Sequence, residues 1–264
     1  MRSFPVALCS SLLLAGAGST AAQVTERTGS IWQETTFIGR TVGAGLVAPL
    51  DWSAHDWLRV GGGAAALGVL SLADGEVRDF ARRNRGALAD DVAREAKPYG
   101  RIGSAAVVGL FLGGGLVLND ARARAVAIDA LAASVLTSAF VVPAFQAASG
   151  RSRPWHDEGT HAFHPFKGRH SFPSGHTAQA FVVATVIAQH YDASWVDAAA
   201  YTGAGLVAAS RIYHDAHHLS DVVTSAVIAT AIGRWVVRRG SAERGSILVQ
   251  PAVVGRTAGI AISF

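Results

Sequence analysis

Cysteine is almost absent from this chain of 264 residues, and the single one is Cys9. Cys9 lies in an apolar stretch near the N-terminus that we expect to be removed, so the mature chain would carry no thiol. It also follows Leu8 rather than a small residue, which argues against lipid attachment at Cys9. Disulfide frameworks, zinc sites with cysteine ligands and cysteine nucleophiles are therefore excluded.

Charge is also scarce, since 16% of the residues are charged and 50% are hydrophobic. The net charge is +4, but the basic residues are interspersed with acids, as in the segment EVRDFARRNRGALADDVAREAK. Such mixing is typical of a solvated helix face, and nothing in the sequence indicates a nucleic-acid partner. The apolar fraction leaves both a membrane protein and a soluble bundle open.

The first 22 residues have the pattern of an exported, cleaved signal peptide. Arg2 precedes an apolar stretch from Val6 to Ala17, and the small residues Thr20 and Ala22 come before Gln23. We therefore expect residues 1–22 to be a signal peptide and the mature chain to start near Gln23.

The remaining apolar runs are too long for strands and lack alternation with a period of two residues, so they predict helices. We expect these helices near 54–73, 76–96, 102–118, 122–147, 175–191, 194–212 and 219–238. The fold predicted for residues 54–240 is an all-α antiparallel bundle with about six core helices. Residues 23–53 are expected to be mostly irregular with a short helix, and residues 241–264 to form a short C-terminal β-hairpin.

Membrane spanning is predicted but not decided by the apolar runs. Ile102–Leu118 has no charge and lies at the lower length limit for a span. Five spans counted from Ile102 leave Arg122, Arg124, Arg238 and Arg239 on the cytoplasmic side, which agrees with the positive-inside rule. We favour this arrangement over a soluble periplasmic bundle. Both place the histidine-rich loops in the periplasm, whereas a sixth span would reverse them.

Chemistry gathers at the predicted helix ends. The segment Pro173-Ser174-Gly175-His176 opens a helix, whose first turn offers free N–H groups and the positive end of a helix dipole to an anion. Arg153 and Arg211 add guanidinium groups suited to phosphate oxygens.

The segment SRIYHDAHHLSD holds the remaining candidates. His217 and Asp221 are four residues apart, so the carboxylate can accept a hydrogen bond from the imidazole and fix which ring nitrogen is free. The fixed imidazole of His217 could then act as a nucleophile, and His176 could protonate the leaving oxygen.

Three segments of the chain resemble the three-part signature of the type-2 phosphatidic acid phosphatase superfamily. They are Arg153-Pro154, Pro173 to His176, and Ser210-Arg211 with His217 and Asp221. The resemblance covers roughly residues 100–238. This group includes bacterial lipid phosphatases, acid phosphatases and vanadium haloperoxidases. The resemblance implies an all-helical fold and a mechanism without metal or other cofactor, through a phosphohistidine on His217 with His176 as acid. The phosphate contacts that it implies are Arg153, Ser174, Gly175 and Arg211.

One position departs from the family pattern. The first motif of the family begins with Lys where this chain has Gln146. The amide keeps a hydrogen-bond donor but loses a charge, which would weaken transition-state stabilisation. We count Gln146 among the phosphate-binding residues and expect Lys167 or Arg169 as a substitute for the missing charge.

These features predict a phosphatase that acts on a phosphomonoester or diphosphate terminus. A lipid is the favoured substrate class, because the helices are apolar and the loop near the site carries Trp155, Phe163, Phe166 and Phe172. A soluble phosphate ester is the alternative substrate. Other readings are a vanadate-dependent haloperoxidase and a relict site weakened by Gln146. A metal site built from His214, His217 and His218 with Asp215 or Asp221 is a further, less favoured alternative. The sequence does not indicate an oligomeric state.

Overall fold

The computed structural model describes residues 19–244, 248–254 and 257–263, with side chains described for residues 33–244. The chain divides into two compact units, one ending at Thr36 and one beginning at Phe37, and each is considered by itself. Residues 1–18, which hold most of the predicted signal peptide, lie outside the described residues. The signal peptide therefore stays a prediction.

Helix α1 (Ser19–Val47) occupies most of the segment that the sequence analysis expected to be irregular. That expectation was wrong because it gave too much weight to the glycines, each of which costs a helix only about 1 kcal/mol. Within the second unit, helix formation buries Phe37 and Val42. Gly45 packs closely against the side chain of Leu136, which would have to move to accommodate a Cβ atom at this position.

The described part of the chain after α1 is dominated by helices, as predicted. Their bounds are η1 (Ala48–Asp51), α2 (Ala54–Leu70), η2 (Ser71–Ala73), α3 (Asp74–Arg83), α4 (Ala87–Ala96), η3 (Lys97–Gly100), α5 (Ile102–Val117), α6 (Ala121–Ser134), the π-helical η4 (Val135–Val141), α7 (Val142–Ser149), η5 (Pro154–His156), α8 (Gly175–His190), α9 (Ser194–Tyr213) and α10 (Leu219–Arg244).

The predicted helix 76–96 is divided into α3 and α4 by residues 84–86. Asn84 leaves the helical conformation and its side-chain amide donates to the carbonyl oxygen of Phe80, which ends α3. Gly86 is extended and begins α4. Local polar residues thus interrupt a pattern that is continuous in its hydrophobic spacing.

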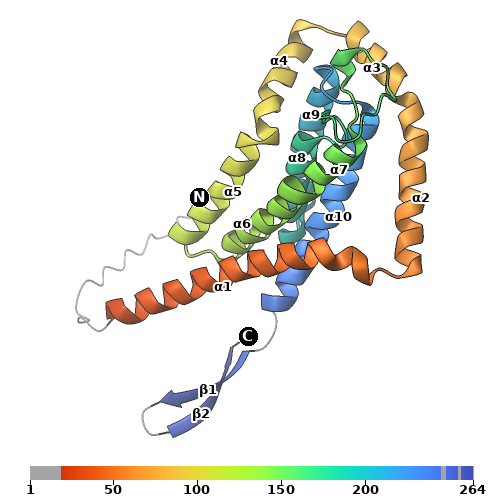
Figure 1. The fold of residues 1–264 in the computed structure, drawn as a ribbon. Helices are drawn as coiled ribbons and strands as arrows, with labels where there is room; N and C mark the ends of the chain where they lie inside the picture. Colours follow the sequence, from red (N-terminus) through yellow and green to blue (C-terminus); the bar gives the residue numbers. More distant parts are fainter. Residues whose placement is uncertain (1–18, 245–247, 255–256, 264) are drawn as a thin grey trace, which may run out of the picture. The chain divides into compact units, whose positions relative to one another are not determined.

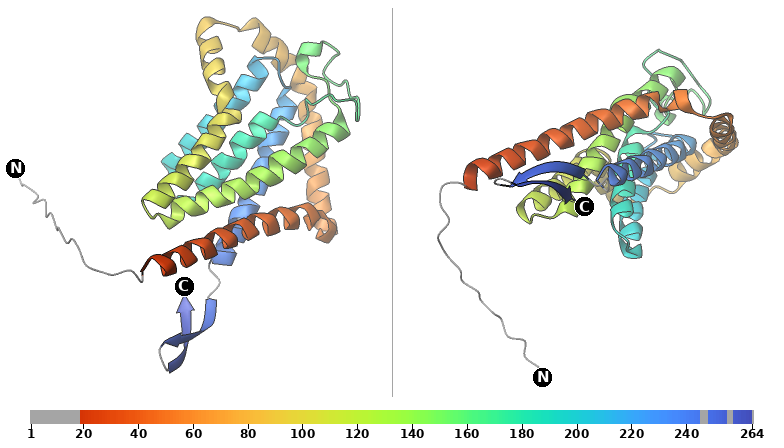
Figure 2. Two further views of the ribbon diagram at one scale, coloured as in Figure 1. Left: turned by 60° about the vertical axis from the view of Figure 1, so that its left-hand side comes forward. Right: turned by 90° about the horizontal axis from the view of Figure 1, so that it is seen from below.

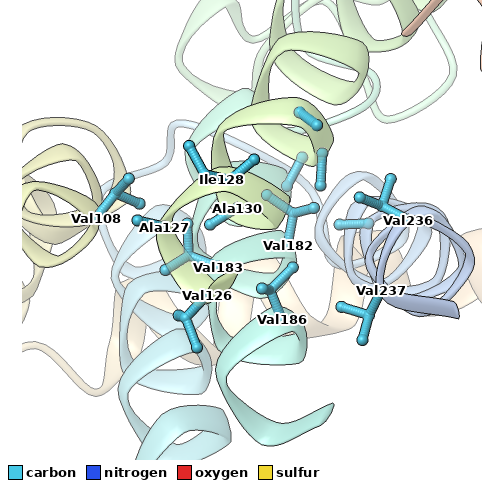
Figure 3. Packing of buried hydrophobic residues seen from close by; sticks show 14 of the residues in the cluster. Val108, Val126, Ala127, Ile128, Ala130, Val182, Val183, Val186, Val236 and Val237 are labelled. Carbon is cyan, nitrogen blue, oxygen red and sulfur yellow. The ribbon is translucent and has the colours of Figure 1, made fainter. Parts of the chain in front are cut away.

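Helix α8 lies at the centre of the second unit, with α6, α9 and α10 packed around it (Figures 1 and 2). The core is built from small apolar side chains, and Figure 3 shows Val126 of α6, Val182 and Val186 of α8, and Val236 of α10 converging. Each fully buried valine stabilises the fold by roughly 1.5–3 kcal/mol relative to an exposed one. Close packing of α8 fixes the position of its first turn, which carries the second motif.

Two helices are long and apolar enough to cross a membrane, namely the continuous helix 121–149 and α10, among the residues that the structure describes. A third is added if the helix 87–100, which consists of α4 and η3, and the helix α5 are taken as one broken span. These two segments are bent by 54° relative to each other. This is fewer than the five spans expected. Helix α8 has only 16 residues, about 24 Å at 1.5 Å per residue, which is short of a bilayer core of about 30 Å.

The C-terminal segments β1 (Leu248–Val254) and β2 (Thr257–Ser263) pair antiparallel. The connection between them, residues 255 and 256, is outside the described ranges. A C-terminal hairpin therefore remains a prediction from the sequence.

Candidate active site

The three motif segments meet at one end of the helical bundle, where α7, α3 and α9 end and α8 and α10 begin (Figure 1). The long loop between α7 and α8 starts at Gly150, which has a positive φ of 55°. A Cβ atom there would collide with the carbonyl oxygen of His164, so only glycine lets the loop fold back at this point. The loop then returns to the start of α8 with the second motif.

His217 is buried and its Nδ1 atom lies 2.7 Å from the carbonyl oxygen of Ser171. Because a carbonyl oxygen can only accept a hydrogen bond, Nδ1 must carry the proton. In the neutral ring the lone pair is then on Nε2. Burial lowers the pKa of His217 and the charge of Arg153 lowers it further, while Asp221 opposes both. The ring is thus held neutral, with an unprotonated Nε2.

Asp221 is completely buried but does not hold the His217 ring directly, contrary to the expectation from their spacing. Its Oδ2 atom is 3.7 Å from Nδ1 of His217, beyond hydrogen-bond distance. Instead Oδ2 accepts from the hydroxyl of Ser171 at 2.6 Å and from the backbone N–H of His218 at 2.9 Å. Asp221 therefore orients His217 through Ser171 and through its charge.

A second buried carboxylate, Asp74 at the start of α3, supports this arrangement. Arg151 donates to Oδ1 of Asp221 and to Oδ2 of Asp74, both at 2.6 Å. Asp74 also accepts from the backbone N–H and the hydroxyl of Ser220 at the start of α10. The sequence analysis missed Arg151, although it stands two residues before Arg153, and it missed Asp74 and Ser171, for which no motif gave a signal.

Arg153 and Arg211 form the electropositive part of the site. Burial lowers the pKa of the Arg211 guanidinium, and the nearby positive charge of Arg153 lowers it further. The Nη2 atom of Arg211 is buried and no described residue accepts a hydrogen bond from it. Arg153 stacks on Trp155, with its guanidinium carbon 4.6 Å from the ring centroid. Two adjacent guanidinium groups with an unused buried donor favour an anion between them.

His176, in the first turn of α8, faces the same positive charges. Burial lowers its pKa to about 4, and the charges of Arg211, Arg101 and Arg153 all act in the same direction. Without an anion the ring is therefore neutral at neutral pH. A bound dianion would offset the arginine charges and raise this pKa, so that protonation of His176 is linked to occupation of the site.

Ser174 begins α8, but its side chain does not cap the helix. Its hydroxyl accepts a hydrogen bond from the hydroxyl of Thr177 at 3.0 Å, and no backbone N–H is bound. The first N–H groups of α8 remain available, as the start of a helix provides. The second motif thus still presents donors at the positive end of the helix dipole.

Gln146 lies beside the second motif, because its Nε2 atom donates to the carbonyl oxygen of Pro173 at 3.0 Å. This hydrogen bond ties α7 to the turn before α8. Arg169, which the sequence analysis proposed as a substitute cation, is held within the loop by Glu158 at 2.6 Å. Lys167 is exposed. Neither residue is brought into contact with Arg153, Arg211 or His217 by any hydrogen bond or ion pair in the described residues.

An apolar groove of about 620 Å³ runs between α4–α5 and α8–α9. Its lining is mostly small, including Ala184, Gly203 and Val207. Val207 and His176 are the side chains that a Cβ atom on Gly100 would touch, at 3.0 Å and 2.7 Å. The groove, through Val207, therefore reaches the neighbourhood of His176 at Gly100.

The described residues hold no group of three or more His, Asp, Glu or Cys side chains placed to bind a metal ion. His214 and Asp215, two of the candidate ligands in the metal alternative, have other partners. Asp215 accepts from Arg82 and Arg85, and the ring of His214 packs on Tyr213.

Comparison with known proteins places this geometry in context. Residues 128–244 match the family model described as PAP2 superfamily. The chain is 37% identical over 92 residues to a lipid A 1-phosphatase of Porphyromonas gingivalis. This match covers 33% of the chain and only 18% of that protein's length.

Two solved structures resemble the fold. One is a transmembrane PAP2-type phosphatidylglycerolphosphate phosphatase of Bacillus subtilis, with a TM-score of 0.50 and 18% identity over 69% of this chain and 92% of that one. The other is LpxE of Aquifex aeolicus, with a TM-score of 0.49 and 22% identity over 62% of this chain and 94% of that one. The first likeness shows a shared fold.

Proposed function

Because residues 128–244 match the family model of the PAP2 superfamily, we propose that this protein is a lipid phosphatase that removes phosphate through a covalent intermediate on His217. The reaction needs neither metal nor other cofactor in this proposal. The substrate is a phosphomonoester or a diphosphate terminus.

The anion site at Arg153 and Arg211 carries the proposal. Two partly buried guanidinium groups beside each other, one with a buried N–H that has no acceptor, favour a ligand with two or more negative charges. The N-terminus of α8 with Ser174 and Gly175 adds donors, and Gln146 fixes the turn that presents them. A phosphate group satisfies all of these donors at once.

The chemistry follows from the two histidines. Nε2 of His217 attacks phosphorus, the phosphorus–oxygen bond to the alcohol breaks, and protonated His176 donates its proton to the leaving oxygen. A water molecule then attacks the phosphohistidine and gives its proton to His176, and the phosphorus–nitrogen bond breaks. Asp221 stabilises the positive charge that forms on His217 during attack.

The apolar groove supports a lipid as the substrate. Its volume of about 620 Å³ and its small apolar lining suit hydrocarbon, and it reaches Val207 next to His176. Exposed aromatic residues of the neighbouring loop, Trp155, Phe163 and Phe166, fit a membrane surface. The named activities of the P. gingivalis and B. subtilis proteins, on lipid A and phosphatidylglycerolphosphate, belong to the same chemical class.

We further propose that the protein is exported and membrane-associated, with this site on the periplasmic side. The two apolar helices support the membrane part, and Arg2 with the following apolar stretch supports export. Attachment of an impermeant reagent to cysteines placed in the loop 150–174 of intact spheroplasts tests the orientation, since labelling only after lysis contradicts it.

The test of function is phosphate release by the purified full chain in excess chelator. The panel holds a lipid phosphate, an isoprenyl diphosphate, lipid A and a chromogenic monoester, with His217→Ala as control. We expect turnover that survives chelation, vanishes in the variant, and leaves acid-labile phosphate on histidine after quenching. Halide oxidation with bound vanadate, or no turnover on any ester, would instead support the haloperoxidase or the relict reading.

A further inference from the structure

Arg101 stands at the bend between η3 and α5, outside the segment matched by the family. Its backbone dihedral angles, φ −141° and ψ −74°, are not helical, so Arg101 belongs to neither helix. The residue before it, Gly100, is buried and lies so close to His176 that a Cβ atom there would be 2.7 Å from Cβ of His176. The chain therefore delivers Arg101 directly to the edge of the anion site.

The side chain of Arg101 has no partner among the side chains that the structure describes. It is exposed, and within residues 33–244 it makes no side-chain hydrogen bond or ion pair. Its backbone N–H and carbonyl serve the turn and the first turn of α5. Other arginines of the neighbouring segments are engaged, for example Arg94 with Asp91 and Arg82 with Asp215.

The charge of Arg101 reaches the site. It is among the charges that lower the pKa of His176, together with Arg211 and Arg153. No acid of the described residues is an ion-pair partner of Arg101. Because the preceding residue, Gly100, lies against His176, the guanidinium of Arg101 on its flexible stem can approach an oxygen of an anion bound between Arg153 and Arg211.

The site has room for such a charge because Gln146 contributes none. A phosphoryl group in the transition state spreads at least two negative charges over its oxygens. Arg153 and Arg211 offset two of them, while the amide of Gln146 donates to the carbonyl of Pro173. Arg169, the alternative on the loop, is held by Glu158.

We propose that Arg101 is a catalytic residue that contacts the phosphoryl group from the bend before α5 and supplies the positive charge missing at Gln146. This rests on the proposed phosphatase function. It extends the active site to a helix pair that the three motifs do not include.

The experiment compares the full-length wild type with Arg101→Gln, Arg101→Lys and the double variant Arg101→Gln with Gln146→Lys. Lys97→Gln is the matched control, because Lys97 is an exposed cation on the same short segment. Two readouts are taken in detergent, kcat/KM on a lipid phosphate and the affinity for inorganic phosphate by calorimetry. Circular dichroism confirms that each variant is folded.

We expect Arg101→Gln to lower kcat/KM about 10- to 100-fold and to weaken phosphate binding. Arg101→Lys keeps most of both, Gln146→Lys restores most of what Arg101→Gln loses, and Lys97→Gln changes neither. If the wild type turns over and the Arg101→Gln variant has the same kcat/KM and phosphate affinity, the role of Arg101 is overturned and the proposed function stays intact.

A folded Arg101→Gln variant whose loss is recovered neither by Arg101→Lys nor by Gln146→Lys would also overturn it, since the effect would then not be one of charge. Absence of wild-type turnover would instead count against the proposed function. In that case the calorimetry still decides, because an unchanged phosphate affinity refutes the contact and a weakened one supports it.

Discussion

Ser171 joins the two residues that the motif pairs, since its carbonyl oxygen accepts from Nδ1 of His217 at 2.7 Å and its hydroxyl donates to Asp221 at 2.6 Å. The carbonyl oxygen of Ser171 fixes the tautomer of His217. The hydrogen bond from the Ser171 hydroxyl to Asp221 holds that carbonyl in place. Asp221 thus acts on His217 through an intervening serine.

Replacement of Ser171 by alanine tests this relay. The carbonyl remains, so His217 keeps its tautomer, but Asp221 loses a buried hydrogen bond worth about 1.5–3 kcal/mol. We expect kcat to fall about 10- to 100-fold with little change in KM. The control is Ser149→Ala, which removes a hydroxyl bound to the carbonyl of Phe172 in the same loop. An unchanged kcat in Ser171→Ala would show that the carbonyl alone is sufficient.

The buried pair of Asp74 and Arg151 predicts a large effect on stability. Asp74→Asn leaves a buried guanidinium short of one negative partner, and breaking a buried pair typically costs about 3–5 kcal/mol. We expect a clear fall in Tm, measured by tryptophan fluorescence in detergent. Asp91→Asn, which breaks the exposed pair with Arg94, should cost less than about 1 kcal/mol. Similar shifts in the two variants would contradict this account of Asp74.

The pKa of His176, lowered to about 4, predicts a specific dependence of stability on pH. The unfolded chain binds a proton near pH 6.5 and the folded chain does not, so the contribution is complete above pH 6.5 and is lost as pH falls towards 4. His217 and His218, also with lowered pKa, add to this acid sensitivity.

His176→Gln isolates the contribution of one ring. We expect its Tm to fall less steeply between pH 6.5 and 4 than that of the wild type, and saturating phosphate to reduce the difference because the anion offsets the arginines. Parallel curves for the two proteins would show that His176 does not titrate in this window.

The apolar groove predicts a substrate that can be selected by chain length. Gly203 lines the groove on α9 and has open space around its Cβ position. Gly203→Leu should therefore fold, yet raise KM several-fold for a long-chain lipid phosphate and leave a chromogenic monoester unaffected. Gly205→Leu is the control on the same helix, with open space but away from the groove. Equal kinetics for both leucine variants on the lipid would remove the groove from substrate binding.

The sequence predicted most of the bundle because hydrophobic runs report helices directly. All seven helices expected after residue 53 are present, with one divided at Asn84. Helix α1 was not predicted, since its burial depends on a partner such as Leu136 far along the chain. Propensity alone underestimates a helix whose glycines serve packing.

The candidate site was predictable where side chains repeat a motif. Its three segments do lie at one end of the bundle, while their catalytic roles stay proposals. Ser171 could not be identified, because its contribution to His217 comes from a carbonyl that every residue has. Asp74 could not be identified either, since it reaches the site only through tertiary packing. The same holds for Arg101, whose neighbour Gly100 packs against His176 only in the folded chain.

The bond between Asp74 and Ser220 has a consequence for the limits of the functional unit. Asp74 accepts a hydrogen bond from the backbone N–H of Ser220, in the first turn of the helix that follows His217, and it precedes residue 128, where the family segment starts. A protein cut down to residues 128–244 would carry every motif residue and still lack the carboxylate that seats α10. The smallest piece able to keep His217 in place must therefore include the start of α3.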